Sequence, residues 1–268
     1  MPYSVNNGVR SYYEVYGEGR PLVLIHANPF DRRLWTYQIA RFSPFYKVIA
    51  MDLRGYGNTD KPENPFTLAD LTDDVLAICD REGVQRAIFG GVSVGSGIAM
   101  YIGLHHAQRA DALVLVGGSA RGPGDNLKKI IDGFEKQDLA SYLRSLIVSY
   151  HAPGFAETSL GKWWIDAFVE KANTLSAKSI AQVFTARGTY DMSGMLADIK
   201  VPTLVINGEY DVSLAAGGAT AKGIPGAKHV VLPNTGHACN LEDPAAFDAA
   251  MIGFLQANGL SAGPRQPA

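Results

Sequence analysis

The sequence lacks the features that mark several classes of protein. It has only two cysteines, Cys79 and Cys239, in 268 residues, which is too few for a disulfide framework and fits a reducing compartment. Its 24 basic and 26 acidic side chains leave no basic excess, and it contains no run of lysines and arginines. Because a nucleic-acid binder needs a basic surface to displace counterions, we expect no nucleic-acid partner.

Targeting and membrane signals are also missing. The first ten residues contain no apolar core, so we expect no signal peptide and a cytoplasmic protein. The uncharged stretch 87–104 has the length of a membrane span, but five glycines and two serines interrupt it. We interpret it as a buried strand, a tight turn and a buried helix, and expect no membrane partner.

Short apolar runs alternate with helical patterns along most of the chain. The apolar runs are typical of strands buried on both faces, and a hairpin over residues 3–16 precedes them. Strands that alternate with helices indicate an α/β fold with a parallel sheet and helices on both faces. The predicted strands are 21–25, 47–51, 87–92, 112–116, 203–206 and 229–232, and the main helices are 34–42, 68–81, 94–106 and 244–256.

The alternation breaks between residues 119 and 199, where only helical patterns occur. We interpret this stretch as a helical cap inserted into an α/β core that comprises residues 1–118 and 200–258. The composition of residues 259–268 indicates a flexible C-terminal tail.

The strongest chemical signal is the pentapeptide Gly91-Val92-Ser93-Val94-Gly95, which follows a buried strand and opens a helix. A G-x-S-x-G sequence at such a junction is typical of a nucleophile elbow, a turn so sharp that its flanking residues must be small. The elbow projects its serine above the sheet. Ser93 is therefore the candidate nucleophile.

A serine hydroxyl needs a base, and the base needs an orienting carboxylate. His237 follows the last predicted strand, and Asp211 follows the strand before it, so both lie where sites form in open α/β sheets. The chain order Ser93, Asp211, His237 is the one expected of a hydrolase with this elbow. Glu209 is a rival for the acid, although its place within the turn favours an outward side chain.

Acyl transfer also needs donors for the developing oxyanion. One candidate is the backbone N–H of Val94, at the start of the helix after the nucleophile. The other is Asn28, in the loop His26-Ala27-Asn28-Pro29 that follows the strand 21–25. The Asn28 side chain is a possible third donor.

These motifs, taken in order, resemble the α/β-hydrolase superfamily along nearly the whole chain. The oxyanion loop, the segment 52–59, the elbow, the segment 201–211 and the segment 235–247 carry the resemblance. Within the superfamily, the chain is most similar to 3-oxoadipate enol-lactonases and small carboxylesterases. It departs from the usual pattern at Ala27, Val92 and Ser96, which leaves the subfamily open. For Asp52 and Arg54 we expect structural ion-pair or turn roles.

The resemblance implies an eight-stranded, mostly parallel sheet, a helical cap and hydrolysis through an acyl-enzyme without a cofactor. We expect no metal site either, because H-E-x-x-H and paired C-x-x-C motifs are absent. The cap is rich in aromatic residues, and candidate pocket residues are Trp164, Phe184 and, from the oxyanion loop, Phe30. A cationic cap residue facing inward would select an anionic substrate.

The sequence thus predicts a serine hydrolase of small carboxylic esters or lactones, acting as a monomer or homodimer on a small-molecule substrate. Three alternatives use the same residues: a C–C bond hydrolase of ring-cleavage products, a cofactor-free perhydrolase, and a ligand sensor with slow turnover.

Overall fold

The computed structural model describes residues 3–122, 124 and 126–261, which are built around an eight-stranded sheet. The strand order is β1-β2-β4-β3-β5-β6-β7-β8. The first two neighbouring pairs are antiparallel and the other five are parallel, which confirms the prediction of a mostly parallel sheet. The strands are β1 (Tyr3–Asn6), β2 (Val9–Tyr16), β3 (Arg20–Ile25), β4 (Tyr46–Met51), β5 (Ala87–Val92), β6 (Ala110–Val116), β7 (Thr203–Gly208) and β8 (Lys228–Leu232).

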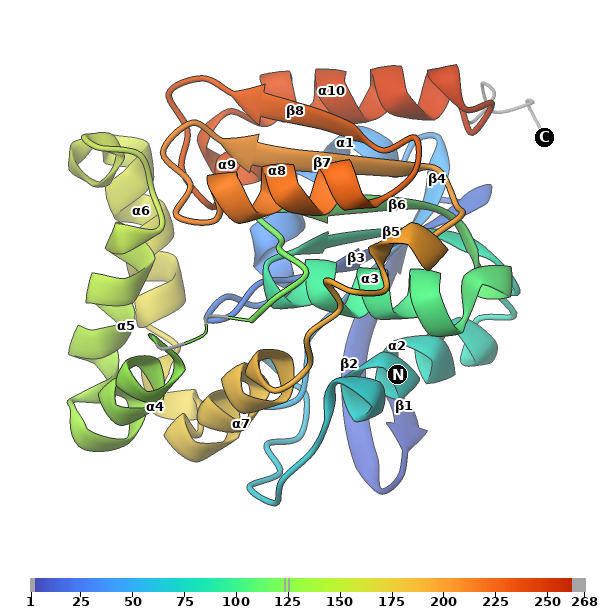
Figure 1. The fold of residues 1–268 in the computed structure, drawn as a ribbon. Coiled ribbons are helices and arrows are strands. Elements are labelled where there is room, and N and C mark those ends of the chain that lie inside the picture. Colours follow the sequence, from blue (N-terminus) through green and yellow to red (C-terminus); the bar gives the residue numbers. More distant parts are fainter. Residues whose placement is uncertain (1–2, 123, 125, 262–268) are drawn as a thin grey trace.

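Helices cover both faces of the sheet (Figure 1). On one face, α1 (Thr36–Phe42) and α10 (Pro244–Ala257) pack against one apolar cluster. On the other face, α2 (Leu68–Arg81), α3 (Val94–His105) and α8 (Leu214–Gly223) enclose a second cluster. The central strands β3, β4, β5 and β6 are mostly apolar and buried, because a sheet covered on both faces has no wet side.

Four α-helices lie between β6 and β7 in the described part of the chain, together with short 3-10 turns, and the described part of residues 119–199 contains no strand. They gather at one end of the sheet, on the left of Figure 1, and we call them the cap helices. They are α4 (Asn126–Lys136), α5 (Leu139–Ser149), α6 (Ser159–Val169) and α7 (Ala177–Gly188).

The start of the predicted tail is ordered. Leu260 is buried in the cluster beside α10, and its carbonyl accepts a hydrogen bond from the Tyr46 hydroxyl at 3.1 Å. The remainder of the predicted tail, 262–268, lies outside the described residues.

The parallel sheet explains where a site can form. The carboxyl ends of β3, β5, β7 and β8 meet at one edge, and the residues that follow them come together there. Asn28, Ser93, Asp211 and His237 each follow one of these strands.

Candidate active site

The candidate residues converge on one cavity of about 680 Å³ between the sheet edge and the cap helices. Its walls include Ser93 and Val94 from the elbow, Asn28 from the loop after β3, and His237 from the loop after β8. Asp211 lies behind His237, with only 5% of its surface exposed. The structure therefore brings the five predicted residues into one place, with four at the cavity and one supporting them.

The elbow holds Ser93 in a backbone conformation that side chains rarely adopt, with φ 54° and ψ −109°. Two glycines make the turn possible. A Cβ atom on Gly91 would come within 2.1 Å of the Gly95 carbonyl, and one on Gly95 would come within 2.3 Å of the Ile25 carbonyl oxygen. Strain of this kind costs about 1–3 kcal/mol and persists where the surrounding structure enforces it. Here β5 and α3 enforce it, and Ser93 lies at the cavity wall.

His237 is oriented by Asp211. The imidazole Nδ1 lies 2.7 Å from Asp211 Oδ1, and both side chains are buried. Burial raises the pKa of Asp211, but the His237 imidazole and donors from Ser213 and Asn207 outweigh it and hold that pKa at about 2. The carboxylate is thus ionised and accepts the proton of Nδ1–H. This tautomer leaves the lone pair of Nε2 free to act as a base.

Asn207 is a part of the site that the sequence analysis missed. Its Nδ2 donates to Asp211 Oδ2 at 2.9 Å, and its Oδ1 accepts from His229 Nε2 at 2.9 Å. Asn207 is fully buried near the end of β7. An amide at the end of an otherwise apolar buried strand is the signal that would have found it. Glu209, the rival acid, is exposed and accepts the backbone N–H of Asn234 instead.

The oxyanion loop carries polar atoms without partners. Asn28 is 1% exposed, and within the described chain neither its Nδ2 nor its Oδ1 has a hydrogen-bond partner. Val94 is the first residue of α3, where backbone N–H groups have no partner within the helix. The helix start also adds positive potential beside Ser93. The loop and the helix thus offer donors to a group bound in the cavity.

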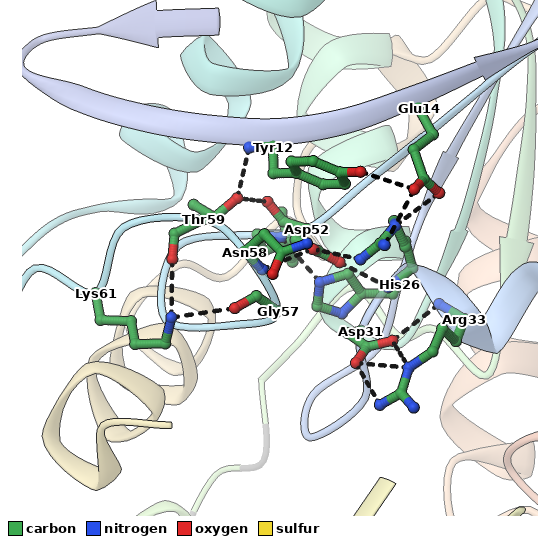
Figure 2. A network of polar contacts seen from close by, with 12 residues as sticks. Tyr12, Glu14, His26, Asp31, Arg33, Asp52, Gly57, Asn58, Thr59 and Lys61 are labelled. Atoms are coloured by element: carbon green, nitrogen blue, oxygen red, sulfur yellow. Dashed lines mark hydrogen bonds and ion pairs between the residues drawn. The ribbon is translucent and has the colours of Figure 1, made fainter. Parts of the chain in front are cut away.

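The His26 ring, labelled in Figure 2, holds this loop in place. Its Nε2 accepts the backbone N–H of Leu53 at 2.9 Å, so Nδ1 carries the proton and donates to the Ala27 carbonyl at 2.8 Å. Burial lowers the pKa of His26, which keeps the ring neutral. Beside it, Asp52 pairs with Arg32 at 2.8 Å. His26 therefore supports the loop and does not act as a base.

Asp52 and Arg54 belong to separate ion pairs. Asp52 pairs with Arg32, which also pairs with Glu14 at 2.8 Å. Arg54 pairs with Asp74 of α2, with its Nη2 2.9 Å from Asp74 Oδ1. Both pairs tie loops to the core away from the cavity lining.

Only one of the three predicted pocket residues lines the cavity. Phe184 of α7 does, whereas Phe30 and Trp164 are not among the described lining residues. Both pack on Phe168 of α6, with ring centroids 4.9 and 5.7 Å away, respectively. The prediction is corrected for these two, because α6 packs its aromatic face against the α1 side of the core. The cap residues that line the cavity come from α4, α5 and α7 and include Ile130, Tyr142, Leu146 and Phe184.

The charged groups at the cavity are all cationic among the described lining residues: Arg121, Lys129 and Arg187. Arg187 is 6% exposed, and burial lowers its pKa to about 10, so it is charged at neutral pH. Its guanidinium donates to the carbonyls of Ser119, Arg121 and Tyr190. No carboxylate forms an ion pair with it in the described chain.

The described residues hold no group of histidine, cysteine, aspartate and glutamate side chains suited to a metal ion. Cys79 and Cys239 are both free and buried. No helix in the described part of the chain is long and apolar enough to span a membrane.

Residues 20–244 match the family described as the alpha/beta hydrolase fold, and the chain belongs to this family. It is similar to 3-oxoadipate enol-lactonase 1 from Acinetobacter baylyi, with 28% identity over 84% of this chain and 85% of that protein. The pimeloyl-[acyl-carrier protein] methyl ester esterase of Pectobacterium carotovorum is 27% identical over 92% and 98% of the two chains. Among solved structures, the enol-lactonase from Burkholderia xenovorans LB400 superposes with a TM-score of 0.88 at 26% identity, covering 95% of this chain and 100% of that one. The predicted resemblance and fold are confirmed.

Proposed function

We propose that this protein is a serine hydrolase that cleaves small carboxylic esters or lactones through an acyl-enzyme. The observation that carries the proposal is the single cavity lined by Ser93, His237, Asn28 and Val94, with Asp211 behind it holding His237 by its Nδ1. Relatives named as a lactonase and an ester esterase support the substrate class.

The geometry assigns each residue a step. Ser93 Oγ attacks the carbonyl carbon while His237 Nε2 takes the hydroxyl proton, and Asp211 stabilises the imidazolium that forms. The oxyanion accepts hydrogen bonds from the N–H groups of Val94 and Asn28. When the tetrahedral intermediate collapses, the C–O bond breaks and His237 returns the proton to the alcohol oxygen. In a lactone that alcohol remains attached to the acyl group.

Water then completes the cycle. It attacks the acyl-enzyme carbonyl, His237 takes its proton, and the second collapse releases the acid and restores Ser93. None of these steps calls for a cofactor. Residues 119–199 act in this scheme as a cap, because α4, α5 and α7 provide the apolar wall opposite the sheet edge.

The charges point to an anionic substrate. Arg187 is buried with carbonyl partners only, and carbonyls satisfy its N–H groups without neutralising its charge. Lys129 lines the same cavity, and so does Arg121, although Asp191 pairs with Arg121 at 3.0 Å. A carboxylate on the ester or lactone would supply the missing negative charge.

Turnover and labelling together test the reaction. We expect the protein to hydrolyse p-nitrophenyl esters from C2 to C12, and we expect Ser93→Ala to lower kcat by at least about 10⁴-fold. A fluorophosphonate should label the protein on Ser93, as located by peptide mass spectrometry. Labelling of Ser93 without ester turnover would move the assignment to the C–C bond hydrolase or the sensor. Unchanged turnover in Ser93→Ala would exclude the mechanism.

A matched substrate pair tests the charge. We expect the monomethyl ester of a dicarboxylic acid to have a higher kcat/KM than the dimethyl ester. Arg187→Gln should lower kcat/KM for the anionic ester by about 10–100-fold, since hydrogen bonds to charged groups contribute about 1.5–3 kcal/mol. It should change kcat/KM for the neutral ester much less, and Arg187→Lys should retain part of the preference. Equal losses on both esters would show that Arg187 serves the fold only.

A further inference from the structure

Glu242 is a partly buried carboxylate that the proposed reaction does not use. It ends the short helix α9 (Cys239–Glu242), five residues after His237. Its Oε1 accepts the backbone N–H of Gly236 at 2.9 Å, and its Oε2 accepts that of Ala152 at 2.8 Å. Gly236 belongs to the His237 loop, whereas Ala152 belongs to the connection that follows α5 in the cap. One side chain thus bridges the core and the cap.

The same two segments also touch directly. The backbone N–H groups of His237 and Ala238 both donate to the Tyr150 carbonyl, at 2.6 and 3.4 Å. Gly236 packs so closely that a Cβ there would come within 2.6 Å of the Tyr150 carbonyl oxygen. Residues 150–152, residues 236–238 and Glu242 therefore form one hydrogen-bonded unit, which we call the clamp.

The clamp reaches both the base and the cavity wall. The Tyr150 ring lies against the His237 imidazole with centroids 4.9 Å apart, and both residues line the cavity. A displacement of residues 150–152 would therefore move one cavity wall and pull on the backbone that carries His237.

A carboxylate is the group that this place requires. Two N–H donors face the Glu242 side chain from different segments, and a carboxylate offers an oxygen to each. A glutamine would offer one oxygen and turn its NH₂ group toward the other donor. No lysine or arginine forms an ion pair with Glu242 within the described chain. The backbone donors hold it, and such hydrogen bonds are strongest when the acceptor is ionised.

We propose that Glu242 is a positioning residue that locks the His237 loop to cap residues 150–152, so that the imidazole and the Tyr150 wall keep one fixed arrangement. This role rests on the proposed function, since it concerns His237 as the base. Glu242 touches no reacting atom. Its carboxylate acts through the backbone of Gly236 and Ala152.

The ionisation of Glu242 makes the clamp sensitive to pH. Burial raises the pKa of Glu242 to about 7, although the two backbone donors and His237 oppose this and Asp211 adds to it. His151 also lies in the clamp, and burial lowers its pKa to about 4, so it is neutral in this range. The buried Cys239 thiol precedes Glu242 in α9, and burial raises its pKa well above the ordinary value. Above pH 7 both bridges are charge-assisted, and below it they weaken.

Two variants with one control test the proposal. We expect Glu242→Gln to lower kcat by about 10–100-fold while KM changes by less than about threefold, because the cavity is kept and the base is misplaced. Glu242→Asp keeps the charge but is one methylene shorter, so its kcat should lie between those of the wild type and Glu242→Gln. The control is Glu209→Gln, which removes the charge of a carboxylate that accepts one backbone N–H, that of Asn234, without touching the cap. It should retain wild-type kcat.

Hydrogen exchange separates this role from a general loss of structure. In Glu242→Gln, peptides covering 147–155 and 233–240 should both exchange faster, while peptides from β3 and β5 keep their protection. In the wild type, the same two peptides should be better protected at pH 8 than at pH 6 after correction for intrinsic exchange. This comparison of the wild type at two pH values tests the clamp even if the Glu242 variants do not fold.

The outcomes are distinct. Unchanged kcat in Glu242→Gln, or faster exchange in 233–240 alone, would overturn the proposal. Because exchange needs no turnover and fluorophosphonate labelling reports Ser93 separately, failure of the serine mechanism would be seen apart from failure of the clamp.

Discussion

Two polar groups of residues, which lie at the cavity and just behind it and are called walls here, have their hydrogen bonds satisfied to different degrees. The base wall (Asn207, Asp211, Ser213, His229 and His237) is joined by hydrogen bonds from residue to residue. The oxyanion wall (Asn28, Ser93 and Val94) includes a buried amide with both polar atoms unpaired in the described chain. Groups that orient the base in the proposed mechanism are hydrogen-bonded within the protein, and groups that would meet the substrate are left without partners. An unpaired buried polar group lowers the stability of the fold by about 1–3 kcal/mol. The unpaired Asn28 side chain in the oxyanion wall therefore makes the folded protein less stable while no ligand is bound.

The largest expected effect on kcat comes from a substitution in the base wall. We expect Asp211→Asn to lower kcat by about 10⁴-fold, because an amide can donate to Nδ1 and favour the wrong imidazole tautomer. Steady-state kinetics on a p-nitrophenyl ester would measure it. A loss below tenfold would contradict the assignment of Asp211 and reopen the choice of the acid.

The second prediction sharpens the difference between the walls. Asn28→Leu should lower kcat by about 10–10³-fold if the side chain contributes to the oxyanion site, and it should leave the free energy of unfolding equal or higher. The matched control is Asn240→Leu, since Asn240 is equally buried but donates to the Leu34 carbonyl at 2.8 Å. We expect that variant to lose stability.

Denaturant titrations would measure the free energy of unfolding of both asparagine variants, and steady-state kinetics on the same preparations would measure their kcat. The prediction fails if both asparagine variants lose stability to the same extent while Asn28→Leu keeps its kcat. In that case Asn28 would be an ordinary buried residue with its backbone N–H as the sole contribution.

The smallest expected effect is on the free energy of unfolding at low pH, and it concerns Asp211 of the base wall. The pKa of Asp211 is lowered to about 2 in the folded protein, so its ionised form stabilises the fold above its ordinary pKa of 3.8. This contribution, about 2 kcal/mol, should disappear as the pH falls through 2. The slope of unfolding free energy against pH between 4 and 2 should be shallower in Asp211→Asn. Parallel slopes would show that the carboxylate is not stabilised as described.

Much of this fold could be predicted because its signals are local. Apolar runs mark strands covered on both faces, and G-x-S-x-G marks the turn at Ser93, where any Cβ on Gly91 or Gly95 would collide with backbone. The order of Ser93, Asp211 and His237 along the chain maps onto the ends of neighbouring strands because those strands are parallel.

What the sequence did not predict depends on tertiary packing. Trp164 lies on the helix α6, whose aromatic residues suggested that it would cover the pocket. In the structure, α6 packs its aromatic face against the α1 side of the core. Asn207 bonds to His229 and Glu242 bonds to Ala152, which lie 22 and 90 residues away along the chain, and no local sequence pattern encodes those contacts. Periodicity shows which residues share a helix face but not which neighbour that face meets.

The point at which the cap helices leave the sheet has a consequence for substrate range. They depart after β6 and the chain returns in β7, and these two strands pair directly with each other. The length and sequence of the excursion can therefore change without altering the strand order or the elbow. We expect a graft of another cap between these strands to keep the proposed reaction and change the selectivity, provided that it still presents a carbonyl to His237 N–H and an N–H to Glu242. A transplanted cap must therefore reproduce two backbone hydrogen bonds, one to the N–H of His237 and one to the carboxylate of Glu242.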